Sequence, residues 1–208
     1  VLHNSMSRSY ADQAWPEQWA HRPYRVRDGG INCYFRNDGL SDLIGFTYAD
    51  WHAEDAVSNL IHNLESIATN SENPSELVVS IIMDGENAWE HYPRNGGYFL
   101  DNLYKRLSAN PKLEMTTFSA IADKKLPVHT LDTLVAGSWV YGTFSTWIGE
   151  KDKNRAWDML IEAKGVYDEV VASGRLSSSE LKQAELQMAT CEGSDWFWWF
   201  GDYNPGET

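Results

Sequence analysis

The clearest indication of the fold class is an apolar run of seven residues, Leu77-Val78-Val79-Ser80-Ile81-Ile82-Met83. This run is too uniformly apolar for a strand with one solvated face, so it predicts a parallel strand that is buried on both faces. Two shorter segments, Leu43–Phe46 and Glu114–Phe118, predict further strands before and after it.

Helical patterns alternate with these predicted strands. Apolar residues recur every three or four positions from Val57 to Ala68, which predicts a helix that Asp50 caps. A second helix is predicted over Gly97–Leu107, with its apolar side chains facing inward. Alternating strands and helices are typical of an α/β fold with a parallel sheet.

The sequence after Ser119 has a mainly helical pattern. Amphipathic spacing over Asp152–Ala172 predicts a long helix that ends at Gly174. Ser177 and Glu180 have the spacing of a capping box, which predicts the start of another helix. Three strands make only a narrow open sheet, whereas an eight-stranded barrel takes about 250 residues. We therefore expect the chain to be a part of a larger catalytic region.

Charge and composition exclude several classes of partner. Seventeen basic residues against thirty acidic ones give a net charge of −13 at pH 7, which has the wrong sign for binding nucleic acid or an anionic membrane surface. No apolar run approaches the roughly 20 residues of a bilayer span, so we expect no membrane insertion. Ten Trp, ten Tyr and seven Phe suit either a large core or a site that stacks on neutral sugars.

The sequence predicts no metal or other cofactor. The six histidines are scattered without a metal-ligand spacing, and no phosphate loop, dinucleotide glycine pattern or serine-nucleophile elbow is present. Cys33 and Cys191 lie far apart and form no disulfide framework, which favours a reducing compartment, the cytoplasm.

The motif with the most chemistry is Met83-Asp84-Gly85-Glu86-Asn87-Ala88-Trp89-Glu90. Asp84 directly follows the predicted buried strand, at the sheet edge where α/β enzymes place catalytic groups. An apolar strand and Trp89 beside it would desolvate the Asp84 carboxyl, which suits a general acid. The alternative is that Asp84 only caps the following turn.

Two aromatic motifs lie in the second half, Glu192-Gly193-Ser194-Asp195-Trp196-Phe197-Trp198-Trp199-Phe200-Gly201-Asp202 and Gly137-Ser138-Trp139 with Thr146-Trp147-Ile148-Gly149. Carboxylates beside aromatic planes are one way of holding sugar rings. Packing of these aromatic side chains inside the fold is the alternative, and both interpretations stay open from the residues alone.

Five motifs in this order resemble glycoside hydrolase family 57, the α-amylase, amylopullulanase and glucanotransferase group. They are Leu40–Phe46, Trp51–Val57, Asp84–Glu90, Gly137–Trp139 with Trp147–Gly149, and Glu192–Trp199. The likeness extends from about Arg22 to Asp202, and several long motifs in order are more specific than any one of them.

The resemblance implies a retaining enzyme that acts on α-glucans or malto-oligosaccharides. It implies a partial (β/α)7-type barrel, of which residues 1–118 hold only the last strands, and a helical domain at residues 119–208 that closes over the active site. The family's general acid/base maps onto Asp84. Substrate-binding candidates are Glu86, Trp89, Trp139, Asp195 and Trp196.

The family nucleophile, a Glu on an earlier strand, has no match in this chain and is expected upstream of Val1. We therefore expect the 208 residues to be inactive alone, with the rest of their own catalytic domain outside them. A non-catalytic α-glucan-binding or regulatory relative is the main alternative, and an acidic structural domain with only core aromatics is another. Hydrolysis or transfer, and α-1,4 or α-1,6 specificity, stay open.

Overall fold

The computed structural model describes residues 2, 5, 17–27, 29–85, 89–199 and 201. The chain divides into two compact units, Leu2–Val135 (the N-terminal unit) and Ala136–Thr208 (the C-terminal unit). The predicted domain boundary at residue 118 lies at the start of a helix within the N-terminal unit. The assignment of a barrel portion and a closing helical domain stays a prediction.

The sheet of the N-terminal unit has three short strands in the order β2-β1-β3. β1 (Tyr24–Val26) pairs antiparallel with β2 (Asn32–Cys33) and parallel with β3 (His129–Leu131). Tyr24 and Leu131 are fully buried, because the sheet has a small core of its own. The described fold is therefore mixed helix and sheet, but its sheet is built from segments other than the predicted strands.

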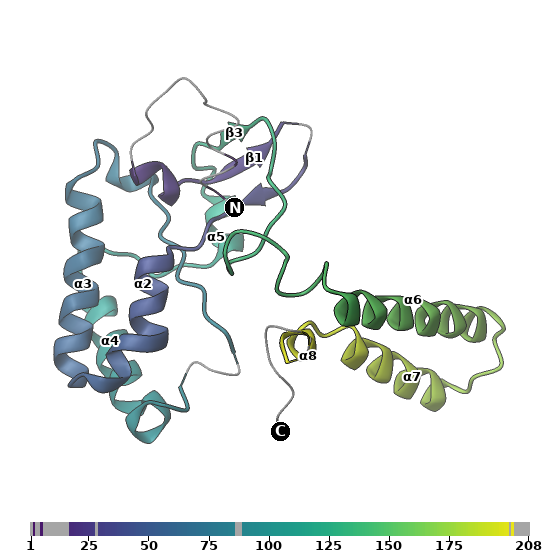
Figure 1. Cartoon of the computed structure of the whole chain (residues 1–208). Coiled ribbons are helices and arrows are strands. Elements are labelled where there is room, and N and C mark those ends of the chain that lie inside the picture. The colour runs from purple at the N-terminus through teal and green to yellow at the C-terminus, as the bar shows by residue number, and fades with distance from the viewer. Residues whose placement is uncertain are drawn as a thin grey trace. The chain divides into compact units, whose positions relative to one another are not determined.

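Helices contribute more of the N-terminal unit than strands do. In chain order they are η1 (Glu17–His21), α2 (Asp38–Asp42), the π-helical turn η2 (Leu43–Thr47), η3 (Tyr48–Asp50), α3 (Ala53–Thr69), η4 (Pro74–Glu76), η5 (Pro93–Gly96), α4 (Gly97–Ala109) and α5 (Phe118–Asp123). Figure 1 shows α3 lying beside α4, and these two helices form the main helix–helix contact of the unit.

The main core lies among α2, α3 and α4, and it confirms both helices predicted in this half. Ala56, Val57, Leu60 and Ile61 are buried on α3, and Phe99 and Leu103 on α4. The predicted cap is wrong, because Asp50 ends the turn η3 and His52 takes the N-cap position of α3.

The strand predicted at Leu43–Phe46 is wrong, because this segment is the π-helical turn η2. The Asn37 side chain accepts a hydrogen bond from the Leu40 backbone N–H at 2.8 Å and starts helix α2, which continues into η2. Leu40, Ile44 and Tyr48 are buried and four residues apart, a helical spacing that identifies the segment.

The run Leu77–Met83 is extended but is no strand buried on both faces, since Ile81 and Ile82 are exposed. Among the described residues, its strand pairing with other segments consists of one isolated parallel bridge, between Ser80 and Arg36. A parallel strand is buried on both faces where it lies within a sheet that helices cover on each side. In the part of the chain that the structure describes, this run has one bridge to a neighbour, so it is not part of such a sheet.

The strand predicted at Glu114–Phe118 is also absent from the described residues. Thr117 accepts a hydrogen bond from the Ala120 backbone N–H at 3.2 Å and caps α5, which begins at Phe118. A threonine at the N-cap competes with strand formation, because its hydroxyl stabilises the first turn of a helix.

The C-terminal unit contains α6 (Lys151–Ala172), α7 (Ser178–Cys191) and α8 (Asp195–Trp198). Both predictions of long helices are confirmed, and α6 and α7 pack against each other as a hairpin (Figure 1). Gly174, at φ +65°, lies in the connection after α6. The predicted capping box is present, with the Ser177 hydroxyl and the Glu180 carboxylate each bonded to the other residue's backbone N–H. None of the helices among the described residues has the length and apolarity to cross a membrane.

Candidate functional site

Asp84 lies at the end of the extended run Leu77–Met83, and Arg36 holds that end in place. The Arg36 guanidinium donates to the Ile82 carbonyl oxygen at 2.8 Å and pairs with Asp38 and Asp42, each at 2.7 Å. Because Ile82 is fixed two residues before it, Asp84 leaves the extended run at a defined point.

The Asp84 carboxyl is exposed, so the apolar surroundings expected for it are not found among the described residues. No hydrogen bond or ion pair joins it to another residue that the structure describes. Gly85 turns the chain immediately after it, with open space where a Cβ would lie. The carboxyl group is therefore accessible to a substrate and to a partner acid.

Trp89 is a half-buried part of the N-terminal core. Its ring lies 5.4 Å from that of Tyr92 in an edge-to-face arrangement and 6.1 Å from that of Phe99. Gly96 packs directly on the same ring. This packing fixes the Trp89 ring in the N-terminal core, and its predicted contact with substrate stays a prediction. Glu86 lies outside the described residues.

The C-terminal unit brings its two aromatic motifs together, because Trp139 and Trp147 both contact Trp198. We call these three residues, with Trp199 next in the sequence, the aromatic platform. Trp139 is 53% exposed and its ring is parallel to that of Trp198, with 6.4 Å between centroids and 4° between planes. Trp147 is tilted by 52° against Trp198 at the same centroid distance. The structure therefore supports the joint placement of these motifs on one surface.

Asp195 lies at the start of α8, beside the most exposed member of the platform. The Trp199 indole N–H donates to the Asp195 carboxylate at 3.4 Å, and 65% of the Trp199 side chain is exposed. A carboxylate acceptor next to an exposed indole face is the combination expected of a sugar subsite. The side chain of Trp196 lies outside what the structure describes.

A buried lysine, which the sequence analysis missed, binds the backbone directly before Trp147 of the platform. The Lys153 ammonium donates to the Thr146 carbonyl oxygen, and burial lowers the pKa of Lys153, an effect that nearby Glu150 opposes. Lys153 is four residues before Trp157 on α6, so it lies on the inward face of that helix. Its position on the apolar face of an amphipathic helix was the sequence signal that could have predicted its burial.

Trp157, on the same helix as Lys153, connects α6 to the aromatic platform. Its indole N–H donates to the Trp147 carbonyl oxygen at 2.9 Å, and its ring stacks on the fully buried Phe197 with 4.2 Å between centroids. Of the Trp and Phe residues in the last motif, Phe197 is thus a core residue, whereas Trp198 and Trp199 reach the surface. Packing inside the fold is confirmed for Phe197, and sugar binding by the more exposed members of the motif stays a prediction.

The chain matches a known family over its first part. Residues 4–133, well over half of the chain, match the model of glycosyl hydrolase family 57. The chain belongs to this family. The resemblance drawn from the motifs is confirmed, and the protein is a member of a glycoside hydrolase family, whose substrates are carbohydrates.

The matched range contains Asp84 and its motif, and it ends before Trp139. The acid candidate is thus inside the family match, whereas the aromatic platform lies in the C-terminal unit beyond it. Among the described residues, no group of three or more His, Cys, Asp or Glu side chains is placed to hold a metal ion.

Proposed function

We propose that this family 57 member acts on α-glucans by a retaining two-carboxylate mechanism in which Asp84 is the general acid/base. The observation that carries the proposal is the position of the Asp84 carboxyl. It is accessible, directly follows an extended segment that Arg36 clamps, and precedes a turn at Gly85 within the family-matched range.

Asp84 would act twice in this mechanism. In the first step the Asp84 carboxyl gives its proton to the glycosidic oxygen, while a second carboxylate attacks the anomeric carbon and the leaving sugar departs. In the second step the Asp84 carboxylate takes a proton from water, or from a sugar hydroxyl, which displaces that second carboxylate. The configuration at the anomeric carbon is retained because it is inverted twice.

The mechanism needs a nucleophilic carboxylate about 5–5.5 Å from Asp84. We propose that it comes from outside the 208 residues, from further strands of a (β/α)7-type barrel that would also cover Ile81 and Ile82. The isolated chain is then expected to be inactive. Cys33 and Cys191 are not joined in a disulfide, in keeping with the proposed reducing, cytoplasmic location.

The aromatic platform suits the remaining part of the proposal, an α-glucan or malto-oligosaccharide substrate. Exposed indole faces at Trp139 and Trp199 stack on the apolar faces of sugar rings, and Asp195 accepts hydrogen bonds from their hydroxyls. Trp196, Glu86 and Trp89 complete the proposed substrate-binding set. A net charge of −13 suits a neutral substrate better than an anionic one.

The test is release of reducing sugar from soluble starch by the chain extended to its natural upstream start. Asp84→Asn is compared with Asp123→Asn, an exposed acid on α5 that serves as the matched control. We expect the wild type and the control to release sugar, the Asp84 variant to lose about 10²–10⁴-fold, and the 208 residues alone to release none.

Two outcomes would contradict the proposal. Sugar release that is unchanged in Asp84→Asn would remove the acid/base role. Starch binding without release by the extended wild type would favour the alternative, a non-catalytic α-glucan-binding relative.

A further inference from the structure

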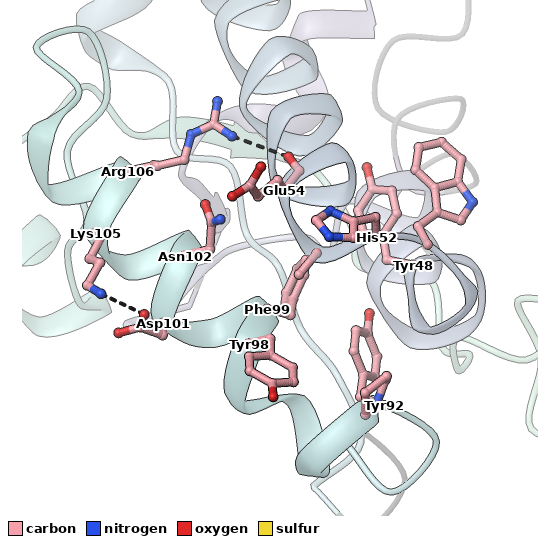
Figure 2. A pocket seen from close by; sticks show the side chains of 13 residues that line it. Tyr48, His52, Glu54, Tyr92, Tyr98, Phe99, Asp101, Asn102, Lys105 and Arg106 are labelled. Carbon is pink, nitrogen blue, oxygen red and sulfur yellow. Dashed lines mark hydrogen bonds and ion pairs between the residues drawn. The ribbon is translucent and has the colours of Figure 1, made fainter.

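A cavity of about 830 Å³ opens in the N-terminal unit between the start of α3 and the first turns of α4 (Figure 2). Its volume is within the range of small-molecule sites, about 300–1,000 Å³. None of the residues that line it belongs to the Leu77–Met83 run or is Asp84, so the cavity is separate from the proposed acid.

The floor of the cavity is aromatic. The rings of Tyr48, Tyr92 and Phe99 pack together, with 5.3 Å between the centroids of Tyr92 and Phe99 and 6.0 Å between those of Tyr48 and Phe99. The two hydroxyls are already used, since Tyr48 donates to Asn59 at 2.7 Å and Tyr92 to the Ile44 carbonyl oxygen at 2.5 Å. The floor therefore offers apolar ring surface to a ligand.

Two aromatic side chains rise from the floor and are exposed. Trp51 is 43% exposed and meets Tyr48 edge to face at 5.4 Å, and Tyr98 is 55% exposed. The Arg94 guanidinium lies 5.2 Å from the centroid of the Tyr98 ring. Because Arg94 and Tyr48 support them, both rings are held in position before any ligand arrives, which lowers the entropic cost of stacking on them.

The polar wall, formed by α4 together with Glu54 of α3, has two acidic and two basic side chains and therefore no net charge. Lys105 pairs with Asp101 at 2.7 Å, and Arg106 donates to the Ser58 hydroxyl at 2.7 Å and to the Glu54 carbonyl oxygen at 3.3 Å. The side chains of Glu54, Asp101, Lys105 and Arg106 lie on one side of the cavity in Figure 2. An anion would meet the carboxylates of Glu54 and Asp101 there, and a cation would meet the two basic groups.

One acceptor in this wall is not satisfied. The side-chain oxygen of Asn102 is buried and has no hydrogen-bond partner among the described residues. Buried polar groups are nearly always hydrogen-bonded. Since this oxygen has almost no exposed surface, we expect the Asn102 side chain to turn toward the cavity when a ligand donor is bound. A hydroxyl group supplies such a donor without bringing charge.

We propose that this cavity is a second, non-catalytic site that binds a neutral saccharide. The exposed rings of Trp51 and Tyr98 stack on the faces of the sugar rings, and the aromatic floor contacts the apolar surface of the saccharide. The Asn102 side chain accepts a hydrogen bond from a sugar hydroxyl. The site goes beyond the proposed function, because it needs neither Asp84 nor a particular linkage in the sugar.

The test is titration of the isotope-labelled full chain with maltoheptaose, cellohexaose and inorganic phosphate, followed by NMR. The signals observed are the Trp51 indole N–H and the Asn102 side-chain amide. We expect one of the two oligosaccharides to shift both signals saturably, and Trp51→Ala and Tyr98→Ala each to weaken binding by about tenfold.

Tyr104→Ala is the matched control, because Tyr104 is on the same helix, is 56% exposed and does not line the cavity. It should leave the affinity at the cavity unchanged. Shifts confined to signals of the aromatic platform would overturn the second site and leave the proposed function standing. Shifts caused by phosphate alone would overturn the assignment to a saccharide. Loss of starch activity in Asp84→Asn is independent of all these results.

Discussion

Gly96 lies at the end of three consecutive residues with left-handed backbone conformation. Arg94 and Asn95 both have φ of 52°, and Gly96 has φ of 78°. Such conformations are costly for residues other than glycine and persist only where the surroundings impose them. Here they turn the chain so that α4 starts directly beside Trp89, and Tyr98 is placed at the cavity.

We predict that Gly96→Ala lowers the free energy of unfolding by about 2–3 kcal/mol. The added Cβ would lie 2.8 Å from Cε3 of the Trp89 ring, in a backbone conformation that alanine adopts poorly. Gly97→Ala is the control, because Gly97 is right-handed and its Cβ would meet only Arg94, at 4.0 Å. Urea unfolding of both variants measures the difference, and equal stabilities would contradict the account.

The buried hydroxyl of Tyr92 should make the protein less stable at high pH. Burial, together with nearby Tyr48, raises the pKa of Tyr92 to about 12, whereas an unfolded tyrosine titrates near pH 10. The unfolded chain therefore loses this proton first, and stability falls as the pH rises from about 10 to about 12. Burial also raises the pKa of Tyr48, which adds to the decline.

Unfolding free energies measured across this pH range should show a shallower decline in Tyr92→Phe than in the wild type. Tyr104→Phe, at an exposed position of the same unit, should leave the decline unchanged. A decline of the same slope in Tyr92→Phe would mean that the buried hydroxyl of Tyr92 does not cause it.

At the scale of single elements, the four long helices were predictable because their determinants are local. Each determinant spans no more than a few turns of its own helix. The determinants are the apolar stripe of α3, the inward residues Phe99 and Leu103 of α4, and the capping box of α7. Helical periodicity and the chemistry of helix caps are therefore enough to predict these helices from sequence.

The predicted strands failed because a strand depends on partners distant in sequence. The run Leu77–Met83 has the composition of a buried strand, but only Arg36 forms a bridge with it among the described residues. The observed strand β1, which contains Arg25, was not among the predicted strands, because three residues are too few to show a period. The local signals that were available, the N-caps Asn37 and Thr117, indicated helix.

The capping box gives a prediction for one element. Ser177→Ala should lower the stability of the C-terminal unit by about 1 kcal/mol, because the Glu180 backbone N–H loses its acceptor. Ser179→Ala, two residues along the same helix, should change it by less than about half of that. Far-UV circular dichroism during urea unfolding measures the stability of both variants. An equal loss of stability in the two variants would contradict the role of the Ser177 cap.

For the whole molecule, the two units differ in how much of each helix is buried. The N-terminal core buries four residues of α3, whereas Lys153 is the buried residue of α6 and Met188 that of α7. Since burial of apolar surface is the main source of stability, the C-terminal helices are held less firmly.

Hydrogen exchange tests this difference. Backbone amides in the middle of α6 should exchange at least about tenfold faster than those in the middle of α3, because local opening exposes less apolar surface. Ligand-free protein at neutral pH, analysed by mass spectrometry after proteolysis, gives both rates in one experiment. Equal protection of the two helices would contradict the difference in stability.

Much of the candidate site was predictable, because its motifs are continuous in sequence. Asp84 and its turn were expected from the residues, and the family resemblance implied that Trp139, Asp195 and Trp196 line substrate subsites. The contact between Trp139 and Trp198 was not predicted. The burial of Lys153 and the cavity beside Trp51 were not predicted either, because both depend on how helices pack. The exposure of Asp84 likewise depends on which segments cover the run before it.

The most direct test of the central claim compares two substrates for Asp84→Asn in the chain extended to its natural upstream start. Starch needs a proton on its leaving oxygen, whereas the fluoride of α-maltosyl fluoride leaves without one. The account predicts a loss of about 10²–10⁴-fold on starch. It also predicts near-normal fluoride release when added azide, which needs no general base, takes the sugar and gives α-maltosyl azide. Equal loss on both substrates, without rescue by azide, would contradict the role of Asp84 as the general acid/base.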